Sequence, residues 1–338
     1  MTQEIRKKVK NKQISSMYLF YGTETFLMNE MKEMLTSELL EEHEKDFNFA
    51  IYDLEETPIE VALEDAETLP FMGEKRMIVL KNPYFLTGEK GKEKVEHSLD
   101  RLEQYILQPA PYSVVIFLAP YEKLDDRKKV TKLLKQHAEV LELNALEEKD
   151  LVKWIGNRAS MYQVTFEEHA AKLLIQLTGP NLMLISKEIE KLSLYVGQEG
   201  HITQETVNLL VARTLEQNIF ELIDKAVHRK LEEAFRIFYD LLKNNEEPIK
   251  ILSLLATQFR LLYQVKDMAR QGYGQQQIAG MLKVHPYRVK LAAAQSNLFS
   301  NEHLMGLVNH LAEMDFEIKN GKIDKKLAVE LFLMKLNN

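Results

Sequence analysis

The sequence predicts an α/β domain with a parallel five-stranded sheet, followed by domains built only of helices. In the first 145 residues, short apolar runs alternate with amphipathic stretches, which is the pattern of strands connected by helices. Such alternation is typical of a parallel sheet that helices cover on both faces. After Asn144 the strand-like runs stop and only helical periods remain. A chain of 338 residues is long enough for about two or three domains.

Five apolar runs are expected to form the strands of the sheet. The run 17–21 stops at Gly22, and the run 114–118 stops at Ala119 and Pro120. Glycine and proline are the residues that most strongly interrupt regular elements. The remaining runs are short and rich in apolar residues, and they lie at 47–51, 77–80 and 139–143.

Four amphipathic stretches are expected to form the helices that connect these strands. The first begins at Thr25 and places Leu27, Met31 and Leu35 on one face, at the spacing of an α-helix. The other three are expected at 59–69, 95–107 and 126–137. Strands and helices together define a predicted first domain over residues 1–145.

Residues 146–212 are predicted to form a small helical domain. Its clearest helix spans 165–178, where Thr165 is expected to be the N-cap and Glu168 to complete a capping box. A Gly-Pro pair ends that helix, and the next one begins after Asn181.

Residues 213–338 are predicted to form a larger domain that is again entirely helical. Its expected helices are separated by short polar or glycine-containing turns. They span 215–229, 231–244, 248–271, 275–282, 287–299, 302–319 and a last stretch from 325.

The composition excludes several classes of protein. Without cysteine, the chain has no disulfide, thiolate metal site, iron–sulfur cluster or cysteine nucleophile. Residues 1–12 are basic but have no apolar core behind them, so they do not read as a secretory signal. No stretch approaches the ~20 apolar residues that a membrane-spanning helix needs. A cytoplasmic protein with no membrane association is therefore expected.

The charge is unevenly distributed along the chain. A net charge of −7 argues against a dedicated nucleic-acid binder. Residues 213–338, however, carry 18 Lys and Arg against 15 Asp and Glu, which is +3, while the preceding residues carry 26 against 36, which is −10. An acidic front and a mildly basic back suggest different partners for the two ends.

An α/β domain followed by a small helical domain is the layout of many nucleoside triphosphatases. Hydrolysis of the nucleotide needs a glycine-rich loop, a Lys and a Ser or Thr after the first strand. The loop from Gly22 to Leu27 has one glycine, no lysine and a glutamate that would repel phosphate. The strand 114–118 ends in Ala119 and Pro120 instead of the carboxylates that would hold magnesium. We expect no catalytic residue, no cofactor and no metal.

One segment between a predicted helix and the third strand departs from the pattern. Three large apolar residues, Leu69, Phe71 and Met72, surround a proline and precede a glycine. One interpretation is a loop plug tucked under the sheet, since apolar residues are mostly inside. The other is an exposed wedge for a partner's pocket, where aromatic and Met anchors carry most of the binding energy. Composition alone does not choose between them.

One interpretation of the basic residues in the last domain is an interface for nucleic acid. Basic residues interleaved with aromatic ones suit backbone contacts combined with base stacking. A solvated charged face is the competing interpretation, and it is the more common one for helical charges. The candidate DNA-proximal residues are Lys266, Arg270, Lys283, Arg288 and Lys290, with Tyr273, His285 and Tyr287 between them.

Four stretches, taken in their order and spacing, resemble a known family. They are YLFYGTETFL at 18–27, LPFMGEKR at 69–76, GPNL at 179–182 leading to EIEKL at 188–192, and HPYR at 285–288. The chain resembles the delta subunit of the bacterial DNA polymerase III clamp loader, most closely the Gram-positive type, over essentially its whole length.

This resemblance implies a degenerate AAA+ module over the first two domains and a helical collar after it. It implies a subunit without ATPase activity that binds the β sliding clamp and helps to open the ring, the role called the wrench. Phe71 and Met72 would be the wedge, the hydrophobic pair that enters a pocket of the clamp, and Leu69 would support it. The implied partners are the tau/gamma and delta-prime subunits and primer–template DNA. Two alternatives remain: an active AAA+ ATPase, such as a helicase or loader motor, and a DNA-binding adaptor unrelated to clamps.

Overall fold

The computed structural model describes residues 5, 8–9, 11, 13–88 and 95–336. The chain divides into two compact units, Met1–Ala145 and Leu146–Asn338, which are treated separately below. Most of the basic stretch 1–12, which was predicted not to be a secretory signal, lies outside the described residues.

The first unit is built on a five-stranded sheet in which every pairing is parallel, in the order β2-β3-β4-β1-β5. The predicted parallel sheet is therefore confirmed. The central strands are the most apolar, and β4 is buried at every position, as expected for strands covered on both faces. The strands are β1 (Met17–Tyr21), β2 (Phe49–Asp53), β3 (Arg76–Lys81), β4 (Ser113–Ala119) and β5 (Glu139–Glu142).

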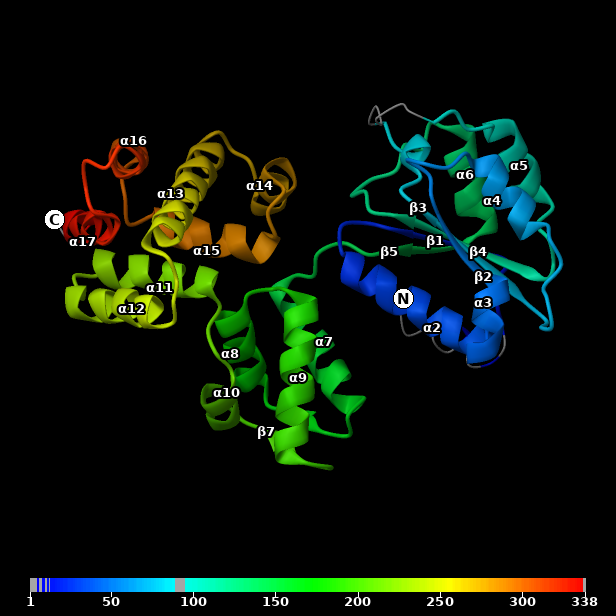
Figure 1. The fold of residues 1–338 in the computed structure, drawn as a ribbon, viewed down its shortest axis with the longest axis horizontal. Helices are drawn as coiled ribbons and strands as arrows, with labels where there is room; N and C mark the ends of the chain where they lie inside the picture. The colour runs from blue at the N-terminus through cyan, green and yellow to red at the C-terminus, as the bar shows by residue number, and fades with distance from the viewer. Residues whose placement is uncertain (1–4, 6–7, 10, 12, 89–94, 337–338) are drawn as a thin grey trace. The chain divides into compact units, whose positions relative to one another are not determined.

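Helices cover both faces of this sheet, with α2 across the sheet from α4, α5 and α6 (Figure 1). Alternate residues of the strands, such as Leu19, Ile78 and Phe117, pack in one cluster with Leu63 of α4 and Leu102 of α5. The helices are α2 (Thr25–Leu39), α3 (Lys45–Asn48), α4 (Ile59–Ala66), α5 (Leu99–Leu107) and α6 (Lys129–His137), with short 3₁₀ turns η1 (Glu42–Glu44) and η2 (Tyr84–Leu86).

Two helices in this unit begin later than predicted because residues before them bond elsewhere. The helix expected at 95–107 begins at Leu99, since the His97 ring accepts from the first N–H of α4. The helix expected at 126–137 begins at Lys129, since Asp125 accepts from the Arg127 N–H in a turn.

The segments on either side of the predicted wedge also differ from expectation. The helix expected at 59–69 ends at Ala66, because Pro70 disfavours a helical residue before it. The strand expected at 47–51 begins only at Phe49, its first residue with a partner on β3, so Phe47 lies in α3 instead. The segment between α4 and β3 is therefore a longer irregular turn than predicted.

The second unit begins with a small group of helices around one parallel two-stranded ladder. The predicted capping box at Thr165 is wrong: Thr165 belongs to a strand, and its N–H donates to the carbonyl of Gly200. That pairing satisfies the backbone, so the helix starts at Glu168. The elements are α7 (Glu148–Ser160), β6 (Thr165–Phe166), α8 (Glu168–Thr178), α9 (Leu182–Val196), β7 (His201–Ile202) and α10 (Gln204–Leu210).

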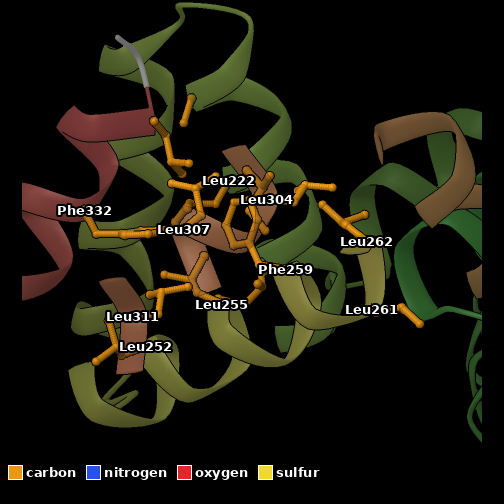
Figure 2. Packing of buried hydrophobic residues seen from close by; sticks show 14 of the residues in the cluster. Leu222, Leu252, Leu255, Phe259, Leu261, Leu262, Leu304, Leu307, Leu311 and Phe332 are labelled. Carbon is orange, nitrogen blue, oxygen red and sulfur yellow. The ribbon is translucent and has the colours of Figure 1, made fainter. Parts of the chain in front are cut away.

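The rest of this unit consists of helices packed around α13, close to the predicted bounds. Figure 2 shows its core, to which Phe259 of α13 and Leu304 and Leu307 of α16 contribute. The Phe259 and Phe332 rings meet edge to face with centroids 5.5 Å apart. The helices are α11 (Leu215–Val227), α12 (Leu231–Lys243), α13 (Pro248–Arg270), α14 (Gln275–Leu282), α15 (Pro286–Ser296), α16 (Asn301–Lys319) and α17 (Lys325–Leu336).

Within the described ranges, every helix is too short or too polar to cross a bilayer. The three-domain division at 1–145, 146–212 and 213–338 stays a prediction.

Candidate functional site

The turn between α4 and β3, residues 69–73, presents a cluster of exposed apolar side chains. Leu69 is 70% exposed, Phe71 54% and Met72 81%. These values rule out the interpretation in which the segment is a plug beneath the sheet. Large apolar residues exposed together in this way are typical of a surface that another protein covers. We call residues 69–73 the docking turn.

The docking turn is held by a buried side chain from α3. Asn48 is fully buried, and its side-chain amide donates to the carbonyl of Phe71 over 2.8 Å. The same side chain accepts from the Phe71 N–H over 2.7 Å. The nitrogen and the oxygen of the Asn48 amide thus bind the carbonyl and the N–H of Phe71. The backbone of a neighbouring strand would bind the same two groups.

Aromatic packing adds to this attachment. The rings of Phe47 and Phe71 lie against each other with centroids 5.2 Å apart, a separation typical of favourable aromatic pairs. Phe47 is itself 57% exposed. It therefore extends the apolar surface of the docking turn onto α3.

The far end of the turn packs against side chains from the segment before β2. A Cβ atom on Gly73 would lie 2.3 Å from the Glu44 carboxylate and 3.1 Å from the Asn48 amide. Met72, just before it, has a positive φ of 51°, a conformation that non-glycine residues seldom adopt outside sites where the surroundings impose it.

A polar network ties α3 to the ends of α4 and β3. Arg76 donates from Nη1 to the carbonyl of Phe47 over 2.9 Å and forms an ion pair with Asp65. Tyr52 donates to the other oxygen of Asp65 over 2.9 Å. Burial and the bond to the Asp65 carboxylate raise the pKa of Tyr52 to about 12. The docking turn is therefore attached to a network of hydrogen bonds and one ion pair at the edge of the sheet.

The backbone N–H groups of the loop after β1 donate hydrogen bonds to oxygen atoms of the protein itself. The N–H groups of Gly22, Thr23 and Glu24 donate to the Ala119 carbonyl, the Asn144 side chain and the Leu143 carbonyl. In a phosphate-binding loop these are the groups that cradle the phosphates.

Gly22 explains why this loop lies against the chain after β5. It has a φ of +134°, and a Cβ there would lie 2.2 Å from the Leu143 carbonyl oxygen. The glycine therefore permits close packing of two backbones. Burial also raises the pKa of Glu24 above its usual value.

Three of the five candidate DNA-proximal residues have partners within the second unit. Lys266 donates to the carbonyl of Ser296 over 3.0 Å, while Arg288 and Lys290 pair with Glu216 and Glu148. Arg270 ends α13, and Lys283 follows α14 in a left-handed conformation.

The aromatic residues near these bases also have structural positions. Tyr287 is only 9% exposed, and His285 accepts from the Tyr287 N–H to cap α15. The DNA-proximal assignment of the five basic residues stays a prediction. In the part of the chain that the structure describes, no three acidic or histidine side chains gather as metal ligands would.

Asn48, Phe47 and Arg76 were not singled out by the sequence. An asparagine between a short acidic segment and a strand has no distinctive pattern, and its partner Phe71 lies 23 residues away. Only Arg76 carried a signal, because it stands at the end of the LPFMGEKR motif.

Comparisons with known proteins account for almost the whole chain. A family model described as "DNA polymerase III, delta subunit" matches residues 18–144. A second, "DNA polymerase III delta subunit, C-terminal domain", matches 216–336, and one described only as a middle domain matches 147–209.

Individual relatives agree with these models. DNA polymerase III subunit delta of Bacillus subtilis is 51% identical over 336 residues, covering 99% of this chain and 97% of the relative. A probable subunit delta of Aquifex aeolicus is 23% identical and covers 75% and 72%. The solved structure of the Bacillus subtilis DNA clamp loader delta protein superimposes with a TM-score of 0.89, covering 100% of this chain and 99% of that one.

Proposed function

The chain belongs to the family of DNA polymerase III clamp-loader delta subunits, and from this premise we propose that its docking turn binds the β sliding clamp and helps to open the ring. The observation that carries the proposal is the exposure of Leu69, Phe71 and Met72 on a turn whose backbone is hydrogen-bonded to the buried Asn48 side chain. Transferring one such side chain from water into an apolar pocket is worth about 1.5–3 kcal/mol.

Ring opening in this proposal needs no chemistry from the chain. A wedge that binds an open or distorted clamp more tightly than a closed one shifts the clamp toward the open state. The shift is limited to the ratio of the two affinities, and reversing a 1:99 equilibrium requires a ratio of about 10⁴. A rigid wedge suits this task, because its shape cannot adjust to fit both states equally.

We further propose that the chain does not hydrolyse ATP. The N–H groups of Gly22 and Glu24 bind backbone carbonyls. The loop also has no lysine, so neither Thr23 nor Thr25 follows one, as the hydroxyl residue does in a P-loop. ATP turnover in the loader would then belong to neighbouring subunits. An active ATPase, the first alternative, predicts measurable turnover by the purified chain.

The proposed partners beyond the clamp follow from the same family. They are the tau/gamma and delta-prime subunits of the loader, and primer–template DNA held within the assembly. The proposal includes a cytoplasmic location, since clamps are loaded on chromosomal DNA.

The decisive experiment measures binding of the full chain to its sliding clamp in the absence of ATP. The double substitution Phe71→Ala with Met72→Ala should lower the affinity about 1,000-fold, because two central anchors are typically worth 2 kcal/mol or more each and about 1.4 kcal/mol is tenfold. The matched control is Leu194→Ala with Tyr195→Ala, two residues 80% and 60% exposed in the second unit. This control should bind within about threefold of the parent.

The same experiment separates the alternatives. If both double variants bind the clamp as the parent does, the docking turn is not the wedge. If the parent does not bind the clamp at all but binds DNA, the chain is an adaptor of another kind.

A further inference from the structure

We infer that Asn48 is a positioning residue for clamp binding, acting by holding the docking turn in its binding-competent conformation, and that Phe47 belongs to the same clamp-binding surface. This inference rests on the proposed function and extends it from residues 69–73 to α3. It assigns Asn48 no direct contact with the clamp, because the side chain is fully buried.

The first support is the specificity of the Asn48 contact. Its amide group makes one donor and one acceptor bond, both with the backbone of Phe71. Aspartate could accept from the Phe71 N–H but could not donate to the carbonyl, and alanine could do neither. The contact also reaches the central residue of the docking turn, where a change of backbone direction would redirect both Phe71 and Met72.

The second support is the attachment of α3 itself. The carbonyl of Phe47 accepts from Arg76, whose guanidinium also pairs with Asp65. Asp65 and Arg76 belong to α4 and β3, the two elements that the docking turn connects. Asn48 therefore links the exposed turn to a half-buried ion pair instead of to another loop.

The third support is the continuity of the apolar surface. The exposed ring of Phe47 lies 5.2 Å from that of Phe71. A pocket that receives Phe71 would also meet Phe47. The clamp-binding surface would then come from two segments, and Asn48 would set their relation to each other.

The expected kinetic signature differs from that of a contact residue. A mobile turn populates the binding conformation only part of the time, and the apparent affinity falls by that fraction. Asn48→Ala should therefore slow association with the clamp about 10- to 100-fold while changing dissociation by less than about threefold. Phe71→Ala with Met72→Ala should mainly speed dissociation, as most interface truncations do.

The test measures association and dissociation rates with immobilised clamp, using the full chain and its Asn48→Ala and Asn48→Asp variants. Asn48→Asp keeps the acceptor but places a buried negative charge against the Phe71 carbonyl oxygen, so it should associate at least as slowly as Asn48→Ala. The matched control is Thr131→Ala, another fully buried polar residue of the first unit, on α6. Phe47→Ala should speed dissociation about 10-fold without slowing association.

Two further measurements make the test independent of variant folding. Urea unfolding identifies a variant that binds poorly because it is unfolded. Amide hydrogen exchange on the parent should show the Phe71 N–H protected at least about 100-fold relative to an open turn. An unprotected Phe71 N–H would overturn the inference without any substitution.

The outcomes separate this inference from the function on which it rests. If the parent fails to bind the clamp, the proposed function is wrong. If the parent binds and the Phe71 and Met72 variant does not, while folded Asn48→Ala associates at the parental rate, the wedge stands and the positioning role is overturned.

Discussion

His285 illustrates how a polar residue that sequence patterns associate with binding can serve the fold instead. It lies among basic and aromatic residues, yet its Nδ1 atom accepts from the Tyr287 N–H over 3.1 Å and caps the start of α15. Burial lowers the pKa of His285 to about 4, and the charge of Arg288 acts in the same direction. The ring is therefore neutral in the folded protein at neutral pH, as an acceptor must be.

This arrangement predicts a pH-dependent stability. A histidine has a pKa near 6.5 when unfolded, so between about pH 6.5 and 4 the unfolded chain binds more protons at this site than the folded one. The contribution of His285 is thus fully present above pH 6.5 and is lost as the pH falls toward 4. Allowing for partial exposure, we expect the loss between pH 7 and pH 5 to be about 1–2 kcal/mol.

Urea unfolding of the parent and of His285→Asn at both pH values checks this expectation. Asparagine is a good N-cap and does not titrate, so the variant should lose about 1–2 kcal/mol less than the parent on acidification. All other titrating groups are common to the two proteins. An equal loss in both would show that His285 does not carry the effect.

At the scale of secondary structure, the first unit depends on contacts between elements that are short by themselves. α3 has four residues and α4 has eight, lengths at which an isolated helix is unstable in water. Arg76, the first residue of β3, joins the two helices. Its guanidinium binds the Phe47 carbonyl of α3 and the Asp65 carboxylate of α4. The side chains of Arg76 and Asp65 are only 14% and 16% exposed, so neither charge is well solvated.

Removing one member of such a pair leaves the other charge without a partner away from water. We expect Arg76→Met to lower the free energy of unfolding by about 2–4 kcal/mol, toward the range measured for buried pairs. Tyr52→Phe, which removes one hydrogen bond to Asp65, should lower it by about 1 kcal/mol. Chemical unfolding of the full chain measures both.

Lys243→Met is the matched control, because Lys243 also pairs with an aspartate, Asp240, but the two side chains are 77% and 57% exposed. Its stability should match that of the parent. A comparable loss in Lys243→Met and Arg76→Met would mean that burial does not decide the strength of these pairs.

At the scale of the whole molecule, the acidic front and the mildly basic back separate two modes of association. The surface proposed for the clamp is apolar, while the residues proposed to lie near DNA act by charge. Charged contacts with phosphates weaken steeply with salt because binding releases counterions. Apolar contacts change little over the same range, since screening does not act on them.

We therefore expect clamp affinity to change less than about threefold between about 50 and 200 mM salt. A protein that makes six to ten phosphate contacts would lose about 10³- to 10⁵-fold over this interval. Titrating fluorescently labelled clamp, and separately primer–template DNA, with the full chain at several salt concentrations distinguishes the two. A steep salt dependence of clamp binding would contradict an apolar wedge.

The sequence by itself determined the periodic parts of this protein. The parallel sheet and the later helices follow from local spacing, because burial on one face imposes a period of two or 3.6 residues. The apolar cluster at Leu69, Phe71 and Met72 was recognisable because it departs from that spacing. Local spacing failed at Thr165, where pairing with a distant strand displaced a well-formed capping signal.

Only the tertiary structure decided which of those residues are exposed and which are paired with other parts of the protein. Exposure of the docking turn, its attachment to Asn48 across 23 residues and the pairing of Lys266, Arg288 and Lys290 all depend on contacts between distant segments. The N–H groups of the loop at Gly22 are likewise occupied by carbonyls about 100 residues away in the chain. Hydrogen bonds and burial are set by neighbours in space, and one sequence contains no periodic signal for them.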